Sequence, residues 1–131
     1  IGGMTYFGCS GSLPSAVIGG VSFATMPAFG DFWWGERRLR FLHTPGHGPN
    51  ACSIVVDHGG KQIVFCGDAA HAGATVWGPY NLEWDHWTGK GALAAWEGIE
   101  RLRGIAVDLL CPSHGPMVRD RPRALLATLA G

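Results

Sequence analysis

Alternating apolar and polar positions predict a sheet in the middle of the chain. The segment 32–43, FWWGERRLRFLH, is typical of two strands around a turn at 35–36. Side chains alternate between the two faces of a strand, so Leu39, Phe41 and His43 should share one face. We therefore expect a strand that ends near His43.

Two β-branched segments predict a hairpin further along. They are Ser53–Asp57 and Gln62–Cys66, and the letters HGGK join them. Glycine suits the turn positions of a tight hairpin because it adopts positive φ without strain. Both segments are almost continuously apolar, which predicts burial on both faces of the sheet.

The segment 88–104, TGKGALAAWEGIERLRG, has the pattern of a helix. Thr88 is the expected N-terminal cap, and Gly104 is expected to end the helix in a left-handed turn. Apolar residues recur at every third position and are expected to form one buried stripe: Leu93, Trp96, Ile99 and Leu102.

The C-terminal part predicts one more strand and one more helix. Ile105–Cys111 has the pattern of a buried strand that Pro112 ends. The final helix is expected over Arg121–Ala130, with Asp120 as its cap and Pro122 in its first turn.

The first 30 residues carry a weaker pattern, with short elements expected near Ala16–Ile18 and Val21–Thr25. The later order of strand, hairpin, helix, strand and helix is typical of the α/β class, a mixed sheet covered by helices. Residues 1–131 are expected to form a single domain or half-domain.

Composition narrows the classes of function. Of 131 residues, 47% are apolar and 15% charged, which allows a real core, and the formal net charge is zero. A nucleic-acid binder usually has a basic excess, so no nucleic-acid partner is expected. No apolar run reaches the roughly 20 residues of a membrane span, and no signal peptide is evident, so we expect a cytoplasmic protein without a membrane partner.

The cysteines suggest a reducing compartment. Cys9, Cys52, Cys66 and Cys111 form no CxxC pair, and all four are expected to be reduced. A nucleophilic thiol at Cys111 beside His114 is an alternative role, but no flanking signature supports it.

Three polar residues each follow a predicted strand on a glycine- or proline-rich loop: His47, Asp68 and His114. Loops that leave the same edge of a sheet converge, so these side chains are expected to meet. Two imidazoles and a carboxylate suit zinc, iron or manganese. Each residue alone could instead be an ordinary turn residue bonded to backbone, but the threefold repetition favours a metal site.

Further candidates lie beside this set. His71 follows Asp68 by three positions, and the segment 77–87 contains Trp84 and His86 among its aromatic residues. Such side chains suit a substrate pocket next to a metal, and we predict that His71, Trp84 and His86 bind substrate. The alternative is that the tryptophans pack under the loop.

The strings HTPGHGPNACSI, VFCGDAA and LLCPSHGP, in that order, resemble the later metal motifs of the metallo-β-lactamase superfamily. The resemblance implies an αββα sandwich and two metal ions, zinc with iron or manganese as alternatives. It implies that His47 completes the first metal site, that Asp68 bridges both ions as the catalytic carboxylate, and that His114 binds the second ion. The implied activity is hydrolysis of a small-molecule ester, lactone, thioester, amide or phosphoester by a metal-bound hydroxide.

The chain departs from that family in lacking the earlier HxHxDH motif, which supplies further ligands. It begins with IGG, letters that commonly follow this motif. We therefore predict the second half of the fold, a fragment that alone has weak or no activity. An open sheet face would favour self-association, another chain or the missing N-terminal half. The alternative function is a catalytically inert half-domain or degenerate relative that acts through a partner chain.

Overall fold

The structure is a computed structural model that describes residues 17–18, 21–22, 30–76 and 89–131. A two-stranded antiparallel pair consists of β1 (Val17–Ile18) and β2 (Val21–Ser22). The main sheet contains β3 (Gly30–Trp34), β4 (Arg37–His43), β5 (Cys52–His58), β6 (Lys61–Gly67) and β7 (Val107–Pro112). The helices are α2 (Lys90–Arg103) and α3 (Pro122–Ala130).

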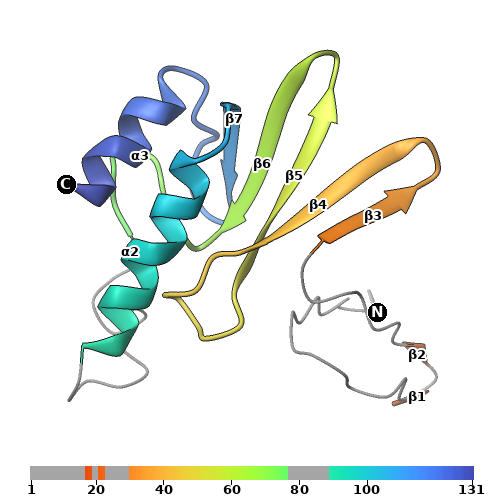
Figure 1. The fold of residues 1–131 in the computed structure, drawn as a ribbon, viewed down its shortest axis with the longest axis horizontal. Helices are drawn as coiled ribbons and strands as arrows, with labels where there is room; N and C mark the ends of the chain where they lie inside the picture. The colour runs from red at the N-terminus through yellow and green to blue at the C-terminus, as the bar shows by residue number, and fades with distance from the viewer. Residues whose placement is uncertain (1–16, 19–20, 23–29, 77–88) are drawn as a thin grey trace.

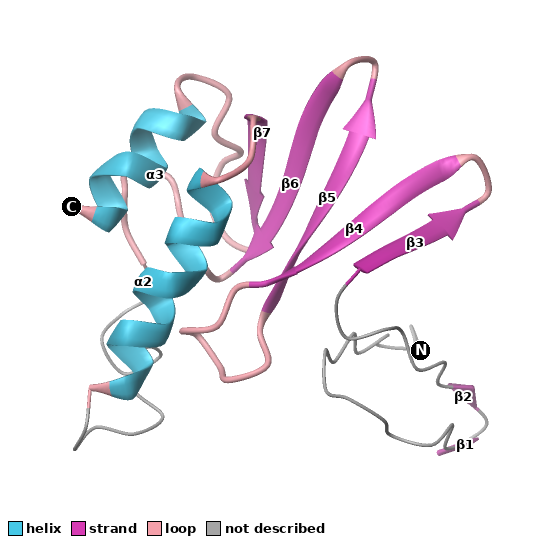
Figure 2. Ribbon diagram, viewed as in Figure 1, coloured by secondary structure: helices cyan, strands magenta, loops and turns pink. Residues whose placement is uncertain are grey.

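The five strands follow the order β3-β4-β5-β6-β7. Neighbours from β3 to β6 are antiparallel, and β7 runs parallel to β6 after the crossover through α2. Both helices lie on the same side of the sheet (Figures 1 and 2). The predicted α/β class with a mixed sheet is therefore confirmed.

The predicted β5–β6 hairpin is confirmed, with its turn at two glycines. Gly59 and Gly60 have φ of 57° and 75°. Residues with a Cβ adopt this left-handed region at a cost, and two such positions in succession define the turn that suits the twist of a hairpin. The pair fixes the register, in which Val55 lies opposite Val64.

The core lies between one sheet face and the two helices. Val55, Val64 and Leu110 from the sheet pack with Leu102 of α2 and Leu126 of α3, and all five are at most 1% exposed. The prediction that β5 and β6 are buried on both faces is wrong. Both helices cover the same face of the sheet. The side chains of β5 and β6 that point to the other face are therefore half-buried or exposed, and Phe65 is 49% exposed.

The apolar stripe predicted along α2 is only half correct. Ile99 and Leu102 are buried, but Leu93 and Trp96 are 63% and 52% exposed. A step of three residues falls about 60° short of a full helical turn, so four such positions spread over about half the circumference. A threefold spacing therefore cannot keep all four on one face.

The predicted helix ends also differ in detail. The N-cap of α2 is Gly89, with φ 64°, and not Thr88; Gly104 does end the helix, but in a right-handed conformation with φ −69°. The N-cap of α3 is Arg121 and not Asp120, because Pro122 takes the first helical position, as predicted.

The cysteines divide into two kinds. Cys66 and Cys111 are free, as predicted. Burial raises the pKa of the Cys66 thiol to about 12, and burial also raises the pKa of Cys111, so neither is an activated nucleophile. Cys52 is disulfide-bonded, so the prediction that all four are reduced is wrong. Bonding requires only that two sulfurs meet in space, which sequence spacing does not reveal. The cytoplasmic location, which partly rested on reduced thiols, stays a prediction.

Two expectations fall partly or wholly outside the described residues. Of the early elements, only β1 and β2 are described, and Trp84 and His86 lie in the segment 77–88, which is not. No helix in the described part of the chain combines the length and apolar character that a bilayer span needs.

Candidate metal centre

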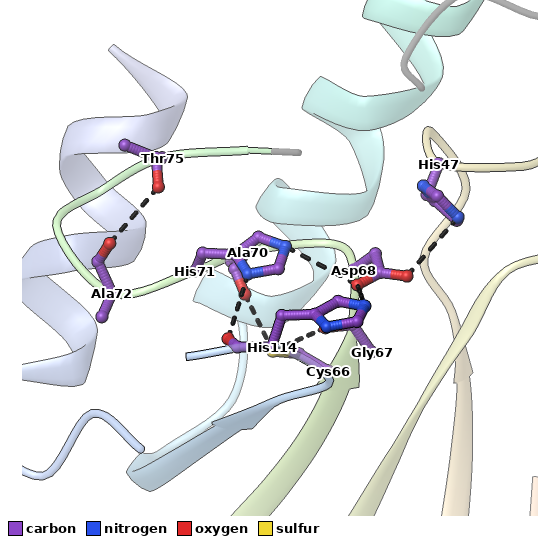
Figure 3. A network of polar contacts seen from close by, with 9 residues as sticks. All are labelled: His47, Cys66, Gly67, Asp68, Ala70, His71, Ala72, Thr75 and His114. Carbon is purple, nitrogen blue, oxygen red and sulfur yellow. Dashed lines mark hydrogen bonds and ion pairs between the residues drawn. The ribbon is translucent and has the colours of Figure 1, made fainter. Parts of the chain in front are cut away.

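Three strands deliver the predicted ligands to one edge of the sheet. β4 and β6 run in the same direction because each is antiparallel to β5, and β7 is parallel to β6. The loops that carry His47, Asp68 and His114 leave the C-terminal ends of these strands. The convergence expected from the sequence is therefore present, and Figure 3 shows the three side chains pointing toward one another.

Asp68 lies at the centre of this cluster. Its Oδ2 is 3.4 Å from His47 Nε2, and its Oδ1 is 3.7 Å from His114 Nε2. The same Oδ1 is also 3.7 Å from His71 Nε2. The two carboxylate oxygens thus face different imidazoles, which is the arrangement a bridging ligand requires.

The loops after β6 and β7 are tied to each other. Gly67 turns the chain at φ 59°, and its carbonyl accepts a hydrogen bond of 2.9 Å from the backbone N–H of Ser113. This bond places Asp68 and His114 next to each other, one residue beyond each partner. This backbone hydrogen bond therefore helps to set the separation of these two side chains.

His71 is the fourth side chain of the cluster and lies beside His114. Its ring stacks on that of His114 at a centroid separation of 6.2 Å and an interplanar angle of 18°. Its Nδ1 lies 3.2 Å from the carbonyl oxygen of His114, which can only accept, so Nδ1 carries the proton of the neutral ring. The lone pair on Nε2 then faces the cluster, as a metal ligand or a proton acceptor would require.

The burial of the carboxylate supplies a test of whether a cation fits. Asp68 is 18% exposed, and its Oδ1 is buried without a hydrogen-bond partner among the described residues. Separations of 3.7 Å are too long for hydrogen bonds to the two imidazoles. A buried carboxylate oxygen without a donor is costly, and a cation between it and the nitrogens would remove that cost.

The spacing of the ligand atoms agrees with this test. Two ligands of a tetrahedral zinc ion, each about 2.1 Å from the metal, lie about 3.4 Å from each other. The contact between His47 and Asp68 has this length, and the other two contacts are slightly longer.

The ligand set is nevertheless incomplete. Within 30–76 and 89–131 no three histidine, cysteine or carboxylate side chains are arranged to hold one metal ion. This part of the chain therefore offers ligand pairs on either side of Asp68, and a full coordination shell needs ligands from elsewhere.

A cavity of about 280 Å³ opens beside the cluster. His71 and His114 form one wall, and Thr75, Val76 and Pro116 contribute to the rest. The side chain of His114 is 56% exposed, so the cluster is reachable from solvent at this side. His71 therefore lies next to both Asp68 and this cavity, and its contact with substrate stays a prediction.

Sequence reasoning missed two residues that hold the His47 loop. They are His43, whose ring hydrogen-bonds to the carbonyl oxygen of Pro49, and Arg101, whose guanidinium donates to the same ring. One signal in the sequence pointed to a close contact between this loop and the helix. Gly98 lies in the middle of the predicted helix, where glycine is unfavourable, and such a glycine usually has a packing reason, such as close approach of another backbone.

Comparison with known proteins agrees with the geometry. The family model described as Metallo-beta-lactamase superfamily matches residues 35–115, which is more than half of the chain and includes all three predicted ligands. No curated protein matches the chain.

Several solved structures share the fold. A metallo-beta-lactamase superfamily protein from Sulfolobus tokodaii is 20% identical with a TM-score of 0.58, over 82% of this chain and 38% of its own. A family protein from Thermus thermophilus is 20% identical, TM-score 0.61, over 76% and 31%. A beta-lactamase domain protein from Burkholderia ambifaria is 21% identical, TM-score 0.61, over 82% and 32%. The chain thus spans about a third of the length of these three proteins.

Proposed function

The chain belongs to the metallo-beta-lactamase superfamily, and from this premise we propose that it forms the second half of a metal-dependent hydrolase. The observation that carries the proposal is the buried Oδ1 of Asp68, which faces two imidazoles without a hydrogen-bond partner in the described residues. Zinc is the proposed metal, with iron or manganese as alternatives, because imidazole and carboxylate ligands suit all three.

Asp68 and His71 have different roles in the proposed site. Asp68 presents one oxygen toward His47 and the other toward His114, so it would be shared between two ions. A bound metal ion would supply Lewis acidity and lower the pKa of its water toward about 7. His71, buried beside Asp68 and bordering the cavity, would orient a substrate or accept a proton through Nε2.

The substrate would be a small molecule with a hydrolysable ester, lactone, thioester, amide or phosphoester bond. The cavity beside His114 supports this size of ligand, since pockets of a few hundred Å³ accept small molecules. Specificity would depend on further loops, among them the segment with Trp84 and His86.

Metal analysis tests this proposal directly. After purification with micromolar zinc and removal of excess metal, we expect zinc to remain bound, with two ions per chain once the complete ligand set is present. A panel of one substrate from each bond class would then identify the reaction. If no transition metal is retained even by the complete protein, the hydrolase is wrong and the inert half-domain that acts through a partner takes its place.

The sheet face opposite α2 and α3 supports a proposal about the rest of the fold. On the side opposite the helices, β4 to β7 present an apolar row: Leu39, Phe41, Ile54, Val56, Ile63, Phe65 and Leu109. Phe41 is buried, and the other members except Phe65 are half-buried. Phe65 is 49% exposed. We propose that the second sheet of the sandwich covers this face, from the same polypeptide or another chain, because an apolar patch of this extent is rarely left in water.

Residues 1–131 expressed alone should therefore self-associate through this face. Phe65→Ser should shift sedimentation toward the monomer, because it removes an aromatic side chain from the centre of the row. Leu93→Ser is the matched control, since Leu93 is 63% exposed on α2 away from the sheet face. A wild-type chain that sediments as a monomer at tens of micromolar would contradict this assignment.

A further inference from the structure

The loop that carries His47 rests directly on helix α2. A Cβ on Gly98 would lie 2.7 Å from the carbonyl oxygen of Pro45, and a Cβ on Gly46 would lie 2.5 Å from the Cα of Ala95. Both separations are shorter than real Cβ contacts, so only glycine permits this approach. Pro45 and Gly46 are themselves buried in the contact.

Arg101 of α2 holds the start of the same loop. Its Nη1 donates to the Nδ1 of His43 and to the carbonyl oxygen of His43, each at 3.0 Å. Glu97, one turn earlier on the helix, lies 3.6 Å from Nη2 of the same guanidinium. The arginine is therefore held on its own helix while it binds the last residue of β4.

His43 connects the start of the loop to its end through a second hydrogen bond. Its Nε2 lies 2.8 Å from the carbonyl oxygen of Pro49, two residues beyond His47. A guanidinium can only donate and a carbonyl can only accept, so a neutral ring with its proton on Nε2 satisfies both neighbours. The ring then bridges the entry and the exit of the loop.

We propose that Arg101 and His43 act as a clamp that fixes the loop in the conformation in which His47 reaches the metal. This inference rests on the proposed metal centre, but neither residue is one of the predicted ligands. Such positioning groups affect metal affinity because they reduce the freedom that a ligand loses on binding.

If Arg101 only stabilised the fold, its loss would lower the melting temperature together with the metal affinity. The clamp predicts a different result. Arg101 is 44% exposed, and exposed ion pairs such as that with Glu97 contribute little to stability. Loss of Arg101 should therefore change the melting temperature little, while the loop that carries His47 becomes mobile. Metal affinity and stability should separate.

The experiment compares Arg101→Ala with Arg103→Ala in the full chain. Arg103 is the matched control because it lies on the same helix and pairs with Glu100, away from the loop. With Co²⁺ alone as the probe, we expect the Kd of Arg101→Ala to rise about tenfold, the lower range for loss of an outer-shell partner. The control should bind like the wild type, and both variants should melt within a few degrees of each other. Equal affinities would overturn the clamp.

A second measurement judges the clamp without metal. Nitrogen-15 shifts of the His43 ring in the metal-free wild type should show one neutral tautomer, with the proton on Nε2, and Arg101→Ala should give a mixture. A mixture already in the wild type would overturn the clamp. Failure of the wild type to bind Co²⁺ even when the complete ligand set is present would instead overturn the proposed function, so the two failures are distinguishable.

Discussion

Asp68→Asn should abolish stable metal binding. Asparagine keeps the shape of the side chain but replaces a charged, shared carboxylate by a neutral amide. Because Asp68 contacts imidazoles on both sides, the substitution weakens both ligand pairs at once. We expect zinc affinity to fall by about 100-fold or more, and hydrolysis to fall with it.

The size of the effect on the stability of the metal-free protein is a second test. In the metal-free protein the buried Oδ1 has no hydrogen-bond partner among the described residues, so Asp68→Asn should cost less than about 1 kcal/mol or even stabilise the fold. With saturating zinc the wild type alone should gain stability, since a ligand that binds only the folded state raises its melting temperature.

Asp57→Asn is the control for this variant. Asp57 is an exposed carboxylate on β5, next to the hairpin turn and not in the ligand cluster. It carries the same change of charge, so it should leave the zinc-dependent shift in melting temperature intact. An Asp68→Asn protein that holds as much zinc as the wild type would show that Asp68 is not a ligand.

The order of elements was predictable because each has a local cause. Two successive glycines set the hairpin between β5 and β6, and Pro122 set the start of α3. The errors concern which side of each helix or strand packs against the rest of the protein. Spacing of apolar residues does not tell which side of α2 meets the sheet, so Leu93 was misplaced.

The candidate site was predictable to the same extent. His47, Asp68 and His114 follow strands that end at one edge, and that rule needs no side-chain detail. Their support was not predictable, because it depends on contacts distant in sequence. The contact of Arg101 with His43 spans 58 positions and follows from how α2 lies on the loop.

Gly46→Ala should be among the most damaging single substitutions in the described part of the chain. Gly46 has φ 137°, a region that L-residues rarely adopt, and that strain alone costs on the order of 1–3 kcal/mol. The added methyl would also lie 2.5 Å from the Cα of Ala95, which is backbone and cannot rotate away. We expect the free energy of unfolding in urea to fall by about 3 kcal/mol or more, within the range of overpacking and strain.

Gly48→Ala separates this effect from a general loss of loop flexibility. Gly48 lies in the same loop, its φ is outside the left-handed region, and a Cβ there would meet nothing within 4 Å. Its stability should change by less than about 1 kcal/mol, and its zinc affinity should match the wild type. Gly46→Ala should lose both, because moving the loop away from α2 also moves His47 away from Asp68. If the two alanine variants unfold at the same urea concentration, the close packing of this loop on the helix is wrong, and the helix does not determine where His47 lies.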